Sequence, residues 1–157
     1  MSNPNMPPVG SGPLIKMTPD EIKKGAPWMT SWYKTKIINV VSSESKDKQS
    51  INHVVHYEVM ELQGAQDPDY LNRTLGLMGG TNFNSKAMGK MIPLLAACEG
   101  ITQVEFIEKY KTTGIEFKLT DLKGKFVQIK VEMGDNNSGG FIPKVTGWLP
   151  YSDIIPF

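Results

Sequence analysis

One stretch of the chain, residues 31–41, combines aromatic and basic side chains in an alternating order. Trp32, Lys34 and Lys36 occupy every second position, and the many β-branched residues around them predict a strand. If Ile37 and its alternate neighbours mark the buried side, these three side chains share the opposite side. A protein that holds an unpaired nucleic-acid strand needs cations for the phosphates and flat rings for the bases. This strand would supply both, although a solvated strand face with one tryptophan over the end of a barrel is the alternative interpretation.

Other predicted strands carry further candidates for the same task. Parity alone does not decide which side of residues 51–62 is buried, so His56 and Tyr57 both remain candidates. Arg73 has the chemistry to pair with a phosphate or to lie flat on a base, and an ordinary surface arginine is an equal alternative. The full set of candidate DNA-binding residues is Trp32, Tyr33, Lys34, Lys36, His56, Tyr57, Arg73, Lys130, Phe141 and Lys144.

Catalytic patterns are missing from the sequence. It contains no GxGxxG, no phosphate-binding GxxxxGK[ST] and no GxSxG motif. The two histidines, His53 and His56, would face opposite sides of a strand and so do not favour a shared metal ion. The single cysteine, Cys98, lies in the apolar run 94–98 and is predicted to be buried and inert. We therefore expect a protein that is not an enzyme and needs no cofactor or metal.

The composition is that of an ordinary globular domain with loose ends. The chain has 157 residues, of which 39% are hydrophobic and 21% charged. The 17 basic and 16 acidic side chains give a net charge of +1, so nucleic-acid binding would depend on the charge of one face. The single cysteine excludes an internal disulfide, and no secretory signal or membrane-spanning stretch is evident. We expect a cytoplasmic protein.

The order of the predicted elements favours one fold class. Residues 1–27 are expected to form a flexible arm with a short helix, capped by Thr18 and ended by Gly25. Strands are expected at 31–41, 51–62, 70–78, 125–133 and 141–149, with helices at 84–99, where Pro93 should mark a kink or a break, and at 102–110. The prediction is mainly β: a five-stranded OB-fold, a Greek-key barrel with a helical segment between strands 3 and 4. An unrelated α+β sandwich is the alternative.

Four segments of residues 28–151, the expected OB-fold domain, follow one another in a distinctive order. They are the opening strand 32–37 (WYKTKI), the helix 89–100 (GKMIPLLAACEG) and the closing segments 124–131 (GKFVQIKV) and 144–150 (KVTGWLP). In this order they resemble a family of bacteriophage single-stranded DNA-binding proteins. The resemblance implies a protein that coats single-stranded DNA with little sequence preference during phage DNA replication, recombination or repair. The expected location is then the host cytoplasm.

In the last residues, 152–157, an acidic residue precedes an apolar pair and a final Pro-Phe, in the order Asp153, Ile154, Ile155, Pro156 and Phe157. This segment resembles the C-terminal tip of bacterial single-stranded DNA-binding proteins. In that family the tip docks replication and repair enzymes by terminal-carboxylate capture. The long acidic tail that usually precedes the tip is absent here. An apolar end packed on its own barrel is the alternative interpretation of these residues.

Two rival functions follow from the same sequence. The chain would act as a protein-interaction adaptor of the replication machinery if only the tip and the loops bind. It would act as an RNA-binding, cold-shock-like protein if the barrel prefers RNA, because OB surfaces serve both polymers. Each of these functions is compatible with self-association of the chain, and none of them involves a membrane.

Overall fold

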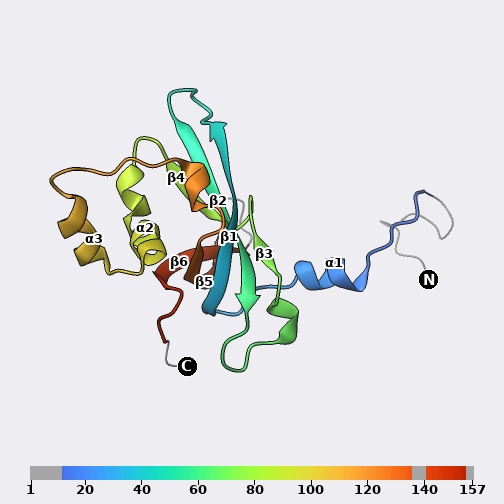
Figure 1. The fold of residues 1–157 in the computed structure, drawn as a ribbon. Helices are drawn as coiled ribbons and strands as arrows, with labels where there is room; N and C mark the ends of the chain where they lie inside the picture. Colours follow the sequence, from blue (N-terminus) through green and yellow to red (C-terminus); the bar gives the residue numbers. More distant parts are fainter. Residues whose placement is uncertain (1–11, 136–140, 155–157) are drawn as a thin grey trace.

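The computed structural model describes residues 12–135 and 141–154. It is mainly β, with an antiparallel sheet of six strands and few helices (Figure 1). The strands are β1 (Ser31–Glu44), β2 (Ile51–Glu61), β3 (Thr74–Leu75), β4 (Thr81–Asn84), β5 (Phe126–Asp135) and β6 (Phe141–Pro150). The α-helices are α1 (Pro19–Lys24), α2 (Ile92–Glu99) and α3 (Gln103–Tyr110), and the 3₁₀ turns are η1 (Pro68–Tyr70), η2 (Met88–Met91) and η3 (Leu119–Leu122).

The strand β1 lies in the middle of the sheet and organises it. It pairs with β2 on one side and with β5 on the other, and β5 in turn pairs with β6. The far edge of β2 is shared by two short strands, since β3 pairs near Tyr57 and β4 pairs with residues 52–55. The sheet order is therefore β3-β2-β1-β5-β6, with β4 beside β2.

The predicted third strand at 70–78 is confirmed only at Thr74–Leu75 and is wrong for the rest of that range. That stretch begins at the end of η1 and contains the two-residue β3, and the longer β4 follows at a position where no strand was expected. The tight turn from Gly76 to Gly80 separates the two strands, and the Gly80 N–H donates to the Gly76 carbonyl at 2.9 Å. A Cβ atom on Gly80 would lie 2.3 Å from that oxygen and 2.6 Å from the Val55 carbonyl, so only glycine fits there.

The two ends of the open sheet approach each other at one point. A Cβ atom on Gly79, in the turn between β3 and β4, would lie 2.8 Å from Cγ of Pro143 on β6. In the described part of the chain, no hydrogen-bonded ladder joins β6 to β3 or β4. A recess of about 420 Å³ lies between these edges, with Val54, Phe83 and Val145 among its lining residues.

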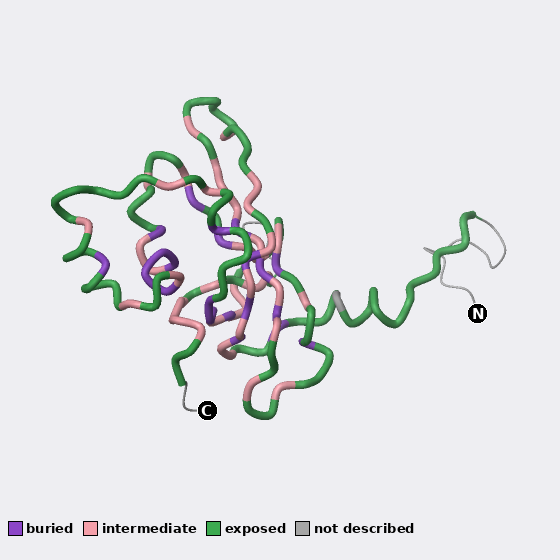
Figure 2. The backbone as a smooth tube through the Cα atoms, viewed as in Figure 1, coloured by how far each residue is buried: buried purple, intermediate pink, exposed green. Residues whose placement is uncertain are grey.

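Alternation along the strands divides the sheet into two faces. We call the side that carries Tyr33 and Ile37 of β1 the inner face, and the side that carries Trp32, Lys34 and Lys36 the outer face. The inner face is buried almost completely, which agrees with the purple strand segments in Figure 2. Its buried residues are Tyr33, Thr35, Ile37, Val55, Tyr57, Val59, Val127, Ile129 and Val131.

The helices α2 and α3 lie on the same side of the sheet (Figure 1). α2 packs against β5 and β6, α3 packs against α2, and Leu94 and Ala97 of α2 and Phe106 of α3 are buried. The expected break at Pro93 is confirmed, because η2 precedes α2 and the proline lies in its first turn, where it interrupts no hydrogen bond. The predicted capping box of α3, between Thr102 and Glu105, is confirmed too.

The helix α1 extends away from the sheet toward the N-terminus in Figure 1. The Thr18 side chain accepts a hydrogen bond from the Glu21 N–H, as the capping pattern predicts, and Gly25 ends the helix. Ile22 in this helix is 59% exposed. Among the described helices, none combines the length and apolar character that crossing a membrane requires.

Candidate nucleic-acid interface

The outer face of β1 carries the alternating residues that the sequence singles out. Trp32, Lys34 and Lys36 are all partly exposed, whereas Tyr33 and Thr35 between them are fully buried. The predicted opposition of these three side chains to Ile37 is therefore confirmed. The pairing of β1 with β2 shifts register between Ile37 and Asn39. Asn39 is exposed, so the alternation that places Ile37 on the buried side ends at this shift.

A row of residues crosses three strands of the outer face at Trp32. Trp32 on β1 pairs with Lys130 on β5, which pairs with Gly147 on β6. A Cβ atom on Gly147 would lie 2.9 Å from Cη2 of the Trp32 indole, so the ring lies directly against this glycine. The missing side chain at position 147 thus makes room for the indole beside the Lys130 stem. Nothing in the sequence marked Gly147 for this role before the register was known.

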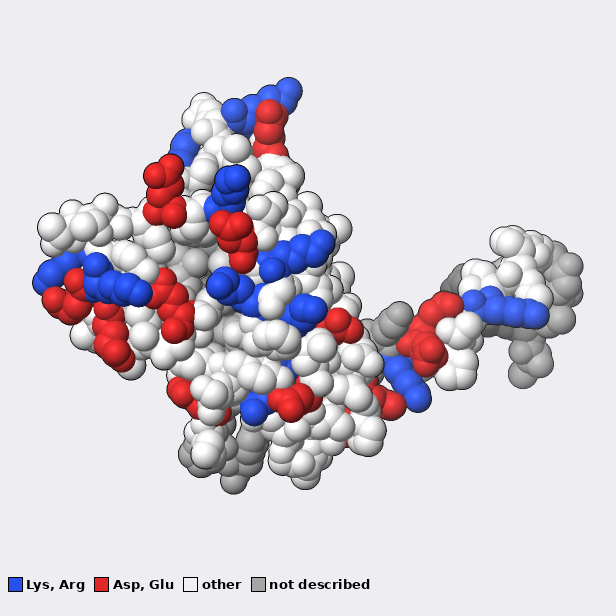
Figure 3. Space-filling view, viewed as in Figure 1, with Lys and Arg blue, Asp and Glu red and all other residues white. Residues whose placement is uncertain are grey.

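Lysines from three strands share this face with carboxylates. Lys34 is 3.9 Å from a carboxylate oxygen of Glu61, and Lys130 is 3.8 Å from one of Glu132. Lys144 pairs with Glu132 across the strands and is exposed. Exposed ion pairs of this kind contribute little to stability, so a stronger anion can displace the carboxylates. Figure 3 shows basic and acidic side chains intermixed on the face in view, in line with the balanced net charge.

Aromatic rings lie beside two of the lysines. The Lys36 ammonium lies 6.0 Å from the centre of the Phe126 ring, and the Lys34 ammonium lies 5.1 Å from that of Tyr151. The two rings contact each other edge to face at 5.2 Å, and Phe126 is 44% exposed. Neither residue belongs to the candidate set from the sequence. The signal for Phe126 is its outward parity on β5, whereas Tyr151 follows the last strand and no periodicity places it.

The expectation that Tyr33 stacks with bases is wrong. Its side chain is fully buried, and its ring packs edge to face on Trp28 at 5.1 Å and against Tyr70 at 5.2 Å. Its hydroxyl donates to the Met29 carbonyl at 2.6 Å, and burial raises its pKa far above the usual range. Tyr33 alternates with Trp32 and therefore must face the core.

The same correction applies to Tyr57, which is 1% exposed. Its hydroxyl pairs with the Thr81 hydroxyl at 2.6 Å and accepts a hydrogen bond from the indole N–H of Trp148 at 3.1 Å. Burial raises the pKa of Tyr57, so the hydroxyl is protonated at neutral pH. The parity question on β2 is thus settled: Val55, Tyr57 and Val59 face inward.

His56 and Arg73 do not belong to the Trp32–Lys130–Gly147 row. His56 is partly buried on β2, and its ring lies against Gly76. The Arg73 guanidinium lies 4.5 Å from the centre of the Trp28 ring and 5.4 Å from that of Tyr70, and it donates to the Ala26 carbonyl. Arg73 therefore anchors the segment that precedes β1 to the core, and burial lowers its pKa.

The remaining predicted residues lie at the ends of β6. Phe141 begins that strand and is 71% exposed.

The loop 45–50 between β1 and β2 is ordered by Asp47, which accepts a hydrogen bond from the Ser45 hydroxyl and one from the Gln49 N–H. Residues 136–140, between β5 and β6, and the tip residues Ile155, Pro156 and Phe157 lie outside the described residues. Ile154 is 95% exposed, which speaks against its packing on the sheet.

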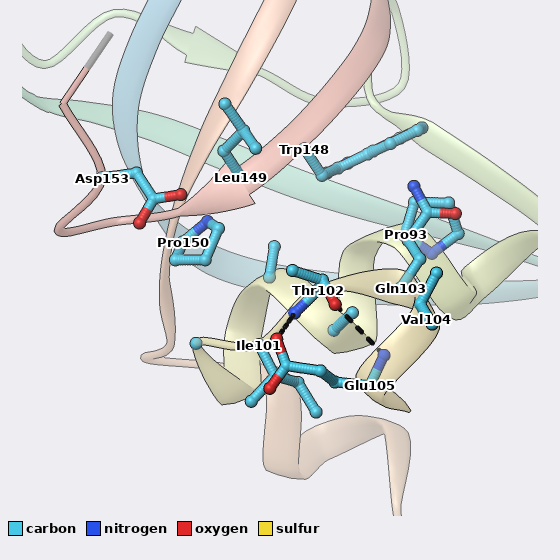
Figure 4. Close-up of a pocket in the computed structure, with 13 residues that line it drawn as sticks. Pro93, Ile101, Thr102, Gln103, Val104, Glu105, Trp148, Leu149, Pro150 and Asp153 are labelled. Atoms are coloured by element: carbon cyan, nitrogen blue, oxygen red, sulfur yellow. Dashed lines mark hydrogen bonds between the residues drawn. The ribbon is translucent and has the colours of Figure 1, made fainter. Parts of the chain in front are cut away.

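A separate recess of about 350 Å³ lies between the α2–α3 junction and the end of β6 (Figure 4). Two of its polar residues, Thr102 and Glu105, are used within the fold, because they exchange the two hydrogen bonds of the capping box. Burial raises the pKa of the Cys98 thiol to about 11, so it is not a nucleophile at neutral pH. In residues 12–135 and 141–154, no group of three or more His, Cys, Asp or Glu side chains forms a potential metal site.

A scan of the sequence against protein-family models found no match, and a search of curated proteins found none. The geometry of the outer face therefore carries the functional argument.

Proposed function

We propose that the outer face of β1, β5 and β6 binds single-stranded DNA with little sequence preference. The observation that carries this proposal is the Trp32–Lys130–Gly147 row, in which a partly exposed indole lies against Gly147 and is paired across the strands with a lysine. Unpaired bases offer a π-face to such a ring whatever their identity, and each stack contributes roughly 1–3 kcal/mol. Coating of single strands in phage DNA replication, recombination or repair is the role that the resemblance implies.

We also propose that the sheet is an OB-type barrel that is incompletely closed. In an OB-fold the first strand pairs with the second and the fourth, and the fifth pairs with the fourth. The pairings of β1 with β2 and β5, and of β5 with β6, agree with this arrangement if β3 and β4 together replace the third strand. The approach of Gly79 to Pro143 lies where the barrel would close.

The mechanism is electrostatic attraction followed by stacking, without a chemical step. Lys34, Lys36, Lys130 and Lys144 would neutralise phosphates, while Trp32 accepts a base. Phosphates would displace Glu61 and Glu132 from their weak ion pairs with Lys34 and Lys130. Since the protein would bind the unpaired state only, it would melt hairpins by mass action.

Salt dependence of oligo-dT binding tests this proposal. The logarithm of the association constant should fall linearly with the logarithm of salt concentration, by about 0.7 for each neutralised phosphate. Removal of one outer-face cation by Lys130→Gln or Lys144→Gln should reduce that slope by about 0.7. Duplex DNA of equal length should bind more weakly, and an RNA oligomer in competition reports the preference between the two polymers.

The matched control is Lys111→Gln, directly after the end of α3. Lys111 is exposed and forms an ion pair with Glu108 at 2.8 Å, so the substitution makes the same charge change away from the outer face. It should leave the slope unchanged. Affinity that does not respond to salt, or an equal effect of the Lys130 and Lys111 substitutions, would contradict the proposal.

A second candidate function is recruitment of replication or recombination proteins by the tip, residues 153–157. The exposure of Ile154 favours it, because this apolar side chain is left without a packing partner in the described structure. Removal of Phe157 should abolish such recruitment and leave oligo-dT affinity unchanged.

A further inference from the structure

The chain turns back across the outer face after β6 ends. The Asp153 N–H donates to the Pro150 carbonyl at 3.1 Å and closes a turn, and both residues are visible at the end of β6 in Figure 4. This C-terminal turn, residues 150–153, lies over Gln128 of β5. Gln128 has outward parity, between Phe126 and Lys130, yet it is fully buried.

The Gln128 amide holds the turn through hydrogen bonds to its backbone. Its Nε2 lies 3.0, 3.3 and 2.6 Å from the carbonyl oxygens of Pro150, Tyr151 and Asp153, which share its two N–H donors. Its Oε1 accepts a hydrogen bond from Gln63 Nε2 at 3.0 Å. This buried amide has all its polar atoms paired and holds the turn specifically, because an apolar substitute would remove its donor from the Tyr151 and Asp153 carbonyls.

The turn places the Tyr151 ring on the outer face between two strands. The ring has Phe126 at 5.2 Å and the Lys34 ammonium over it at 5.1 Å, and its hydroxyl donates to Glu61 on β2. Burial, followed by the nearby Glu61 carboxylate, raises the pKa of Tyr151. The hydroxyl therefore stays a donor at neutral pH. The ring orientation is fixed by the Gln128 contact to the Tyr151 backbone and by the Glu61 contact to its hydroxyl.

We infer that Tyr151 is a second base-stacking residue of the interface and that Gln128 is the positioning residue that holds it there. This inference rests on the proposed function. The Lys34 ammonium now contacts the Glu61 carboxylate and the Tyr151 ring, and a nucleotide can replace both contacts. Its phosphate takes the place of the Glu61 carboxylate beside the ammonium, and its base takes the place of the ammonium on the ring.

The test compares Tyr151→Leu with Tyr151→Phe on two oligomers of equal length, oligo-dT and an abasic deoxyribose-phosphate strand. Loss of the ring should lower oligo-dT affinity roughly 5- to 160-fold, the range for one stacked base, and change abasic affinity less than twofold. Tyr151→Phe keeps the ring and loses only the bond to Glu61, so it should bind oligo-dT within about threefold of the parent chain.

The positioning role is tested by Gln128→Met, which keeps the length of the side chain and removes the amide. The ratio of oligo-dT affinity to abasic affinity should fall toward that of Tyr151→Leu. A merely structural defect would lower both affinities together and leave the ratio unchanged. If Gln128→Met does not fold, the Tyr151 pair alone decides the stacking role.

The outcomes separate this inference from the proposed function. If the parent chain binds oligo-dT with the expected salt slope and Tyr151→Leu binds it equally well, the inference is wrong and the proposed function stands. If the parent chain binds neither oligomer, the proposed function is wrong and the inference falls with it.

Discussion

The two faces of β1 use the same kinds of residue for opposite purposes. On the inner face Tyr33 is fully buried and its hydroxyl donates to a backbone carbonyl. On the outer face, one residue earlier, Trp32 lies partly exposed against Gly147 and beside Lys130. An aromatic side chain thus stabilises the fold or is available to a ligand according to its parity on the strand.

The contacts that a side chain makes with its neighbours, more than its residue type, therefore decide whether it is available to a ligand. The inner tyrosines have partners that saturate their polar atoms, as Tyr57 does with Thr81 and Trp148. The outer lysines have weaker partners, at 3.8 Å and 3.9 Å in their ion pairs. A phosphate can therefore compete for the outer groups, whereas no ligand reaches the inner ones.

The largest expected effect is on the inner face, where Tyr57→Ala should lower the free energy of unfolding by about 3–5 kcal/mol. The substitution leaves a cavity between β2 and β6 and removes the acceptor of the Trp148 indole. Tyr57→Phe keeps the ring and should cost about 1–3 kcal/mol, because buried partners lose their hydrogen bond. Urea unfolding measures both values. A Tyr57→Phe chain with normal stability and lost oligo-dT binding would show that Tyr57 contacts the ligand and does not stabilise the fold.

On the outer face we expect a smaller effect, which is a gain of oligo-dT affinity and not a loss of stability. Glu132→Gln removes the carboxylate near Lys130 and opposite Lys144, so oligo-dT affinity at low salt should rise roughly two- to fivefold. Glu108→Gln on α3 makes the same charge change beside Lys111 and should leave affinity unchanged. Fluorescence anisotropy of a labelled oligomer measures both variants. Weaker binding by Glu132→Gln would mean that phosphates do not contact this row.

Elements with strong local signals were predictable from the sequence. The alternation in residues 31–41 predicts the strand and its faces, and the Thr102–Glu105 capping box predicts the start of α3. The third strand was not predictable, because the tight packing that requires Gly80 involves the distant Val55 carbonyl. Tertiary contacts of this kind override local propensity.

The candidate site was predictable on β1 and less so elsewhere. Parity on β2 admits two interpretations until the hydrogen bonds of Tyr57 choose one. Gln128 and Tyr151 carry no sequence signal, since their arrangement arises from a turn that crosses the sheet after its last strand. Gly147 likewise acquires its role only when the strand register places it against Trp32.

Intrinsic tryptophan fluorescence during titration with oligo-dT tests the central claim most directly. Trp28 is 6% exposed and Trp148 donates to Tyr57 inside the fold, so stacking should quench mainly Trp32. We expect saturable quenching in the parent chain, and its loss in Trp32→Phe while anisotropy still reports binding. Equal quenching in Trp32→Phe, or binding by the parent chain without quenching, would show that no base stacks on Trp32.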